Sequence, residues 1–430
     1  MNYSNPADLG IIACPGGEVF AGEVAAHLKK GYRRSFERMA AEMAGRYNLD
    51  IHYVIHRINF INDAVSPPPH LPGNIEKFRT PRFNISTCFT IFPNGEVKAE
   101  ILESIRGKDI FIIQDVENHY PVNFNGGDAK KTLSVNDHLM TVFVTVDAAK
   151  QAGAGRITLV LPGYPYARQH KAKGREGLTA SRVGKAMEGL GVDRIITLDI
   201  HSRDIGNSFD TMRLENLHAS YQIIRSLSAM DGVLGDDFVV VSPDTGAVDR
   251  NKFYANALKK PLALLYKERD YSRITKNASE SNIAEIKLLG NVKNKTVFIA
   301  DDILGTGGTL LKGMRVLKEN GAGKVICAIS LPLFTGGAIS YFDEAYREGL
   351  FYRIIGTNAV YYEEALKREW YISVNISRLF AQTISRLHKQ QSLSSLLDNR
   401  DIITKLLDGV KPSGAEPADF LPIDESIQPA

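Results

Sequence analysis

Residues 297–310 hold the feature that most constrains this chain, because a strand, two carboxylates and a glycine-rich turn follow one another directly. Val-Phe-Ile-Ala at 297–300 is typical of a strand covered on both faces in a parallel sheet. Asp301 and Asp302 come next, and Gly-Thr-Gly-Gly-Thr at 305–309 then begins an amphipathic helix. Backbone N–H groups at a helix start, with two threonine hydroxyls, can bind phosphate. Adjacent carboxylates suit either ribose hydroxyls or a metal ion. The stretch predicts a sugar phosphate site.

Two common nucleotide-binding turns are excluded at this position. A dinucleotide-binding fingerprint would require a third glycine at position 310, where Leu310 stands. A P-loop would require Gly-Lys followed by Ser or Thr, and no such triplet follows.

Apolar runs alternate with amphipathic segments along most of the chain, and this alternation predicts an α/β fold with doubly wound, mainly parallel sheets. Polar stretches at residues 65–73 and 115–134 are predicted to be loops, and the end to be a flexible tail. The predicted helices span residues 18–30, 136–152, 179–190, 216–228, 249–258, 309–319 and 374–387, and helical patterning continues beyond residue 30. The predicted strands span residues 9–14, 110–113, 157–161, 194–198, 238–241, 262–266, 296–300 and 325–330, with a hairpin at 90–100 and a β-rich stretch at 52–60.

Composition places the 430 residues among ordinary globular proteins, with room for two domains. A formal net charge of +3 is too small to indicate a nucleic-acid partner. The three cysteines lie far apart, so neither a disulfide framework nor a zinc site is expected. No apolar run is long enough to span a membrane, and the start lacks the features of a signal peptide. We expect a cytoplasmic protein without a membrane partner.

Four other polar segments follow predicted strands and could serve an anionic ligand. Arg168 and Gln169 follow two tyrosines, whose rings can pack against a purine. His201 follows the strand at 194–198 and could bind a divalent metal near phosphates. The alternative for each is an ordinary structural role or a solvated surface loop.

The other two segments lie nearer the glycine-rich turn. Asp244 precedes a helix start, where an Asx turn is the alternative. Lys267 and Arg269 enter a polar segment of roughly twenty residues. Paired cations on a mobile loop suit phosphoryl transfer, because its transition state develops charge that must be neutralised.

Taken together and in order, eight segments resemble ribose-phosphate pyrophosphokinase, or phosphoribosyl pyrophosphate (PRPP) synthetase, over most of residues 88–400 and weakly over 9–30. The loop at 301–309 also resembles the PRPP loop of type I phosphoribosyltransferases. Residues 387–393 look like the carboxyl-terminal helix and strand of the family. The eight segments lie at 92–96, 106–109, 135–140, 164–169, 198–201, 242–246, 267–269 and 301–309.

The resemblance implies two stacked phosphoribosyltransferase-like domains. The first would span residues 1–210, with insertions near 31–85 and 116–134 and the return of helix 374–400. The second would span 211–373 and carry the PRPP loop, leaving 401–430 as a tail. The implied reaction transfers the β,γ-diphosphate of ATP to the anomeric hydroxyl of ribose 5-phosphate with Mg²⁺, giving PRPP and AMP. The implied assembly is a homo-oligomer with the ATP site at a subunit interface.

Roles are implied residue by residue. Lys267 and Arg269 would be catalytic, and His201 and Asp244 would place the metal. Residues that would bind ATP are Phe92, Asn94, Glu96, Arg168 and Gln169, the hairpin residues reaching from a neighbouring subunit. Residues that would bind ribose 5-phosphate are Asp301, Asp302, Thr306, Gly307, Gly308 and Thr309.

The chain departs from the family at four positions in or beside these segments. Asn94 and Gly305 stand where Asp is usual, and Ala247 stands where Gly is usual. His170 follows Gln169 in place of Asp, and the loop after it is about one residue shorter. The second insertion would lie near the ATP side.

Two other functions stay open. A synthetase-like regulatory subunit would bind these ligands without turnover, which the loss of the carboxylate at Gly305 favours. A phosphoribosyltransferase would use PRPP to modify a base. Lys267 and Arg269 argue against both, because neither function needs a loop that transfers diphosphate.

Overall fold

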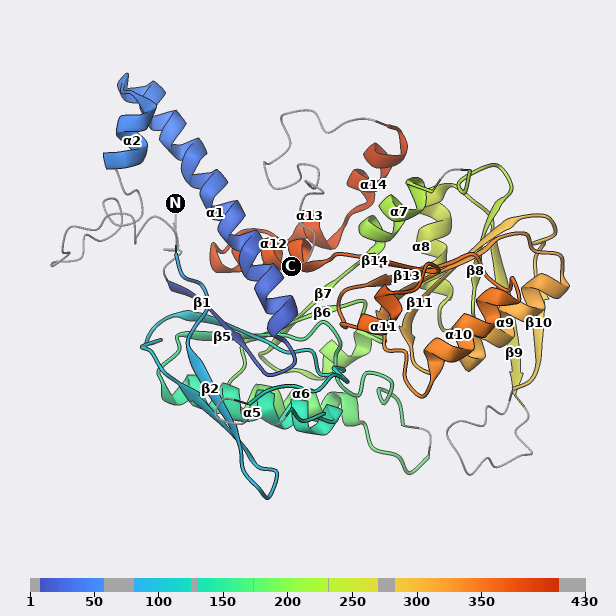
Figure 1. Ribbon diagram of the computed structural model, residues 1–430, viewed down its shortest axis with the longest axis horizontal. Helices are drawn as coiled ribbons and strands as arrows, with labels where there is room; N and C mark the ends of the chain where they lie inside the picture. Colours follow the sequence, from blue (N-terminus) through green and yellow to red (C-terminus); the bar gives the residue numbers. More distant parts are fainter. Residues whose placement is uncertain are drawn as a thin grey trace.

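Two parallel sheets form the framework of the chain (Figure 1). The computed structural model describes residues 8–57, 81–124, 130–172, 174–230, 232–269 and 283–409. The strands of the first sheet are all parallel and lie in the order β1 (Leu9–Ala13), β4 (Asp109–Ile113), β5 (Arg156–Val160), β6 (Arg194–Leu198) and β7 (Arg213–Leu217).

The second sheet is parallel except at one edge, where β9 and β10 form an antiparallel pair. Its strands lie in the order β10 (Ile283–Leu289), β9 (Leu262–Arg269), β8 (Phe238–Ser242), β11 (Thr296–Leu304), β12 (Val325–Pro332), β13 (Arg353–Thr357) and β14 (Tyr371–Val374). The predicted fold class, α/β with mainly parallel sheets, is confirmed.

Helices connect and cover the strands. A separate hairpin, β2 (Thr87–Ile91) and β3 (Val97–Ile101), projects from the first half of the chain (Figure 1). The helices are α1 (Glu18–Tyr47), α2 (Ile51–Arg57), α5 (Val135–Gln151), α6 (Thr179–Gly189), the 3₁₀ helix η2 (Arg203–Ser208), α7 (Ser220–Ser228), α8 (Val248–Leu258), α9 (Gly308–Glu319), α10 (Ala338–Arg347), α11 (Glu363–Leu366), α12 (Ser377–His388), α13 (Ser394–Leu397) and α14 (Arg400–Leu407). No helix in the described ranges is both long and apolar enough to cross a membrane.

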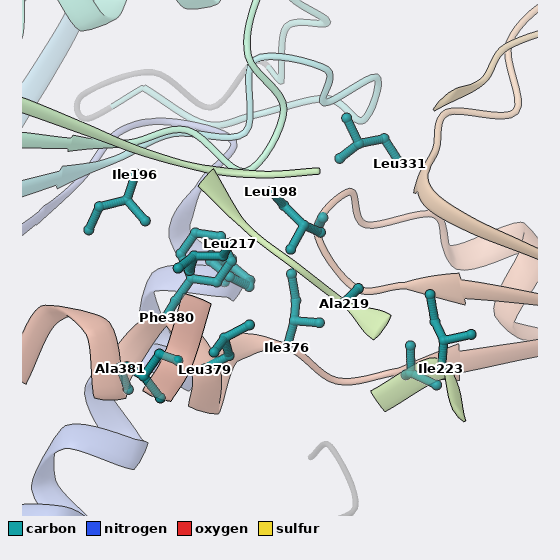
Figure 2. Packing of buried hydrophobic residues seen from close by; sticks show 14 of the residues in the cluster. Ile196, Leu198, Leu217, Ala219, Ile223, Leu331, Ile376, Leu379, Phe380 and Ala381 are labelled. Atoms are coloured by element: carbon teal, nitrogen blue, oxygen red, sulfur yellow. The ribbon is translucent and has the colours of Figure 1, made fainter. Parts of the chain in front are cut away.

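One hydrophobic core joins the two sheets (Figure 2). Ile196 and Leu198 of β6 contribute to it from the first sheet, and Leu331 of β12 from the second. Helix α12, from late in the chain, adds Phe380, whose ring packs edge-on against Phe20 of α1 at 5.2 Å. Burial of this apolar surface holds the sheets together.

Helix α12 is also tied to the first sheet by a buried polar cluster. His388 Nδ1 lies 3.0 Å from Oδ2 of Asp109, at the start of β4. Arg156 donates to Asp109 through Nε at 2.8 Å and also donates to the carbonyl of Leu387 at 3.2 Å. Residues far apart in sequence therefore close the fold, and α12 packs against the first half of the chain.

Several predicted elements need correction. Residues 52–57 of the β-rich stretch form helix α2, because Val54 packs against α1 through Ala40 and Ala44, while the rest of that stretch lies outside the described residues. The helical patterning expected after position 30 belongs to α1 itself, which continues without a break to Tyr47. Residues 387–393, which resembled the family's terminal helix and strand, contain no strand: α12 ends at His388 and the next element is helix α13. The predicted tail from position 401 begins inside helix α14.

Strand β7 is a further correction, because the prediction has no strand at residues 213–217 and begins a helix at position 216. Its alternation of charged and apolar residues suits an edge strand, and Arg194 of β6 pairs with Glu215 across the ladder at 3.1 Å. The first sheet therefore continues past position 210. The prediction also lacked β10, α10, β13, α11 and β14, and the loop predicted at 65–73 lies outside the described residues.

Candidate active site

The site lies where the chain reverses direction across the second sheet. From β8 the chain runs through β9 and β10 to one edge, and then returns to β11 and continues to β14 at the other edge. Strands β8 and β11 are therefore neighbours at the point where the strand order reverses, and ligands of such sheets bind at the carboxyl ends of strands at this point. Asp244 follows β8, and the glycine-rich turn follows β11.

Asn251 of α8 holds the end of β11 in place. Pairing between β8 and β11 ends at Val240 and Phe298, so Ala300 has no partner on that strand. The fully buried side chain of Asn251 supplies one, accepting from the N–H of Ala300 at 2.9 Å and donating to its carbonyl at 2.9 Å. The residue before the carboxylate pair is therefore fixed.

The carboxylate pair lies within β11 and not beyond its end. Pairing with β12 continues through Asp301, Ile303 and Leu304, so the strand runs four residues past the predicted end at position 300. The prediction was wrong because β8 stops pairing early whereas β12 does not.

Asp302 is buried and tied to both halves of the molecule. Its Oδ2 lies 2.6 Å from Nδ1 of His201, which follows β6 of the first sheet. Its Oδ1 lies 3.7 Å from Arg250 Nη1 of α8. Burial raises the pKa of Asp302, but the hydrogen bond with His201 and the charge of Arg250 more than offset this, so its pKa lies below the ordinary range. Asp302 is a carboxylate at neutral pH.

Asp301 has the opposite electrostatic balance. Burial and the neighbouring charge of Asp302 raise the pKa of Asp301 to about 7, although Arg250, 3.6 Å away, acts to lower it. Asp244 contributes further negative charge. Asp301 and Asp302 therefore concentrate negative charge, and a bound cation or hydrogen-bond donors would stabilise their ionised forms.

The glycine-rich turn opens helix α9 in a conformation that glycine permits. Gly307 has φ +77°, and a Cβ there would lie 2.9 Å from Cζ of Phe342 and nearer still to its Cε2. At Gly308, by contrast, a Cβ would meet nothing within 4 Å. Thr306 and Thr309 are exposed, so their hydroxyls and the first N–H groups of α9 can reach an anion.

Arg168 reaches this turn from the first sheet. Its Nη2 donates to the carbonyl of Ile303 at 3.4 Å. A Cβ at Gly305 would lie 3.4 Å from Thr335 Oγ1 and 3.8 Å from Arg168 Nη1, so a side chain fits at 305. Gln169, the second predicted ATP residue of this loop, is exposed like Arg168.

The residues present fit Mg²⁺ as a partly hydrated ion that also contacts substrate. Within the described ranges no three His, Cys, Asp or Glu side chains gather as a metal site. Asp301 and Asp302 are adjacent carboxylates, and the charge of Asp244 acts on Asp301. Mg²⁺ prefers carboxylate oxygens, and protein sites usually supply only one or two of its ligands. Of the predicted metal residues, His201 contacts Asp302. Asp244 accepts from the N–H of Ala247 at 3.0 Å, an Asx turn before α8.

The predicted adenine residues lie at the tip of the β2–β3 hairpin. The N–H of Phe92 donates to the carbonyl of Glu96 at 2.8 Å, and Asn94 Oδ1 accepts from the N–H of Glu96 at 3.2 Å. Asn94 therefore closes the turn, which a carboxylate would also do. The hairpin projects away from the second sheet (Figure 1), and no backbone hydrogen bond among the described residues joins it to the site.

Lys267 and Arg269 belong to a strand and not to a loop. Strand β9 continues to Arg269 and pairs with β10, with Lys267 opposite Ile286. The predicted strand end at 266 was therefore wrong. The placement of these two side chains, and of residues 270–282, lies outside what the structure describes.

Sequence reasoning missed the residues that connect the carboxylates to their surroundings. Arg250 stands in the first turn of α8, and its position after Asp244 in the sequence was the available signal. Asp199, with φ +41°, accepts from Ser330 Oγ of β12 at 2.7 Å and lies 2.7 Å from His218 Nδ1. Local sequence patterns do not predict such contacts between residues of different sheets.

The fold and this site define a phosphoribosyltransferase-type protein. The family model for the N-terminal domain of ribose phosphate pyrophosphokinase matches residues 78–191. The model for the phosphoribosyl transferase domain matches residues 210–349.

Individual relatives are more specific. Ribose-phosphate pyrophosphokinase of Listeria ivanovii is 36% identical over 313 residues, covering 72% of this chain and 88% of the relative. Ribose-phosphate pyrophosphokinase 2 of Enterococcus faecalis is 32% identical, covering 73% and 88%. The crystal structure of phosphoribosylpyrophosphate synthetase from Mycobacterium smegmatis matches with a TM-score of 0.64 and 25% identity, covering 89% of this chain and 99% of that one. The chain belongs to the ribose-phosphate pyrophosphokinase family.

Proposed function

We propose that this chain transfers the β,γ-diphosphate of ATP to the anomeric hydroxyl of ribose 5-phosphate. The observation that carries the proposal is the position of Asp301 and Asp302 in β11, directly before the turn that begins α9. A phosphate at the helix start and a ribose over the carboxylates fit one molecule. Thr306, Gly307, Gly308 and Thr309 would hold the phosphate, and the carboxylates would accept from the ribose hydroxyls.

ATP would bind between the halves of the chain. Arg168 and Gln169 come from the first sheet, and Arg168 already contacts the carbonyl of Ile303. Phe92, Asn94 and Glu96 would reach the adenine of a neighbouring subunit, since their hairpin projects away from its own site. This arrangement requires a homo-oligomer.

The reaction itself demands little covalent chemistry from the protein. The anomeric oxygen attacks the β-phosphorus, the bond from that phosphorus to the oxygen shared with the α-phosphate breaks, and the hydroxyl releases its proton as AMP leaves. Lys267 and Arg269 would stabilise charge on the moving diphosphate. His201 and Asp244, beside Asp301 and Asp302, would hold Mg²⁺, which when bound supplies positive charge to the triphosphate.

We also propose a division into two domains. The first domain would end near 210, with β7 extending it to Leu217, and the second would carry the PRPP loop. A cytoplasmic location would match the supply of both phosphorylated substrates.

AMP release tests the function. Purified protein with ATP, Mg²⁺ and ribose 5-phosphate should release AMP and form PRPP in equal amounts, and omitting the sugar phosphate should stop both. If both ligands bind but no AMP appears, the regulatory-subunit alternative holds. If the protein consumes PRPP only when a base is added, it is a phosphoribosyltransferase.

A further inference from the structure

His201 belongs to a short loop at the end of a strand of the first sheet. The loop, residues 199–202, follows β6 and leads into η2, and it is here called the His201 loop. The N–H of Asp199 donates to the carbonyl of Leu217 of β7 at 2.8 Å. The N–H of the next residue donates to Asn216 Oδ1 of the same strand at 2.8 Å. These contacts fix the start of the loop within the first sheet.

The side chain of Asp199 joins the same loop to the second sheet. It is largely buried, and its Oδ2 accepts from Ser330 Oγ of β12 at 2.7 Å. The same oxygen accepts from the N–H of Ala219 at 3.2 Å, and Oδ1 lies 2.7 Å from His218 Nδ1. Both carboxylate oxygens of Asp199 are therefore engaged by the protein itself.

Ser330 and Asp302 are neighbours on adjacent strands of the second sheet. The pairing of β12 with β11 sets Ile329 opposite Asp301. Ser330 and Asp302 directly follow these two partners, so they lie at the same level of the sheet. Because successive side chains of a strand point to opposite faces, Ser330 and Asp302 also share one face. The second sheet therefore presents a hydroxyl and a carboxylate side by side to the His201 loop.

Two contacts thus set the His201 loop against the second sheet. Asp302 Oδ2 lies 2.6 Å from His201 Nδ1, and Ser330 holds Asp199, two positions earlier in the loop. Ser330 is itself fixed, because it is 2% exposed and its carbonyl accepts from Thr357 Oγ1 of β13 at 2.6 Å. A single contact leaves a side chain free to turn about it, whereas two contacts define its orientation.

We propose that Asp199 is a positioning residue, which holds the His201 imidazole against Asp302 through its hydrogen bond with Ser330. The inference rests on the proposed function, because His201 and Asp302 belong to that site. Asp199 acts through the loop and not on a substrate, since the protein engages both of its oxygens. Functional side chains must be held to within about 0.5 Å of their productive geometry. Loss of the Ser330 contact should therefore lower turnover by way of His201.

A double-mutant cycle of Ser330→Ala with His201→Ala tests the inference by steady-state kinetics. Ser330→Ala removes the hydroxyl but leaves the contacts of Asp199 with His218 and Ala219, so the chain should still fold. Its kcat should fall about tenfold, the scale of one hydrogen bond to a charged group. In the His201→Ala background the same substitution should change kcat by less than about twofold, because no imidazole remains to be positioned.

Further variants separate the inference from other causes. Ser228→Ala removes a hydroxyl that donates to the carbonyl of Arg225 within α7 at 2.9 Å, and it should leave kcat unchanged. If Ser330→Ala does not fold, Ser330→Cys takes its place, because its S–H is a weak donor of similar size and kcat should again fall. A merely structural role would lower kcat by the same factor with and without the His201 imidazole. That result would overturn the inference, as would unchanged kcat in the Ser330 variant.

A crystal structure of Ser330→Ala distinguishes failure of this inference from failure of the proposed function. If the wild-type protein releases no AMP, the proposed function fails, and the distance between His201 Nδ1 and Asp302 Oδ2 then decides the inference. A distance beyond the hydrogen-bonding range, about 3.2 Å, would support the positioning role of Asp199. An unchanged contact would overturn it.

Discussion

His201 Nδ1 lies 2.6 Å from Asp302 Oδ2, although the two residues follow or belong to strands of different sheets and are 101 positions apart. This contact places an imidazole of the first half of the chain against the carboxylate that we propose binds ribose. Arg250 approaches the same carboxylate from α8, so Asp302 stays ionised despite its burial. The candidate site therefore depends on both halves being docked.

The His201–Asp302 contact predicts non-additive mutations. Asp302→Asn should lower kcat/KM for ribose 5-phosphate by about a hundredfold or more. The substitution removes the negative charge that would accept hydrogen bonds from the ribose hydroxyls and that interacts with His201 and Arg250. His201→Ala disrupts the same pair. The loss of transition-state stabilisation in the double variant should therefore be about 0.5–3 kcal/mol smaller than the sum of the losses in the two single variants. Kinetics of the four proteins would measure this, and strict additivity would contradict the coupling.

Two adjacent glycines should respond in opposite ways. Gly307→Ala places a methyl group against Phe342 at a positive φ, so it should distort the phosphate turn, lower the melting temperature and weaken ribose 5-phosphate binding at least about tenfold. Gly308→Ala begins a helix where a Cβ meets nothing, so it should be tolerated. Thermal unfolding and binding titrations would check both. Equal effects would show that the turn is not sterically determined.

Lys267→Ala and Arg269→Ala should each lower turnover by about a hundredfold or more, while the KM for ribose 5-phosphate changes little. The reason is that these charges matter chiefly when charge develops on the diphosphate. Steady-state kinetics with ATP saturating would show the split. An unchanged turnover number in both variants would remove the assigned role.

Gly305→Asp addresses whether a carboxylate at this position is needed. A Cβ there makes only ordinary contacts with Thr335 and Arg168, and phosphate binding relies on N–H groups and hydroxyls elsewhere in the turn. We therefore expect ribose 5-phosphate affinity to change by less than about tenfold. Release of AMP by Gly305→Asp, but not by wild-type protein, would instead identify a natural chain that binds without turnover.

Asp115 should make stability depend on pH. Burial raises its folded-state pKa to about 8 from an ordinary value of 3.8, despite hydrogen bonds from Glu117 and Tyr361 N–H groups. The folded protein then binds more protons than the unfolded chain between these values, so stability must fall as pH rises through that window. Asp115→Asn should reduce this fall. Urea unfolding at several pH values from 5 to 8.5 would test it, and parallel curves for the two proteins would contradict it.

The sequence alone determined the features that depend on residues adjacent to one another in the chain. The apolar run of β11, the glycine turn and helix α9 follow from residues 297–319, and the turn at Asn94 closes through its own side chain. The α/β class follows in the same way, because strand and helix periods are local properties of the chain. The eight ordered segments sufficed to indicate the family.

Other features were decided only by tertiary structure. Residues 52–57 became a helix because Val54 packs on α1, and β11 passes Asp302 because β12 continues beside it. Strand β7 exists because β6 offers an edge. The charge state of Asp302 depends on His201, which a different sheet supplies. Contacts of this kind join residues far apart in the chain, and the free energy that selects them comes from burial and electrostatics in the assembled fold, which no local pattern of residues contains.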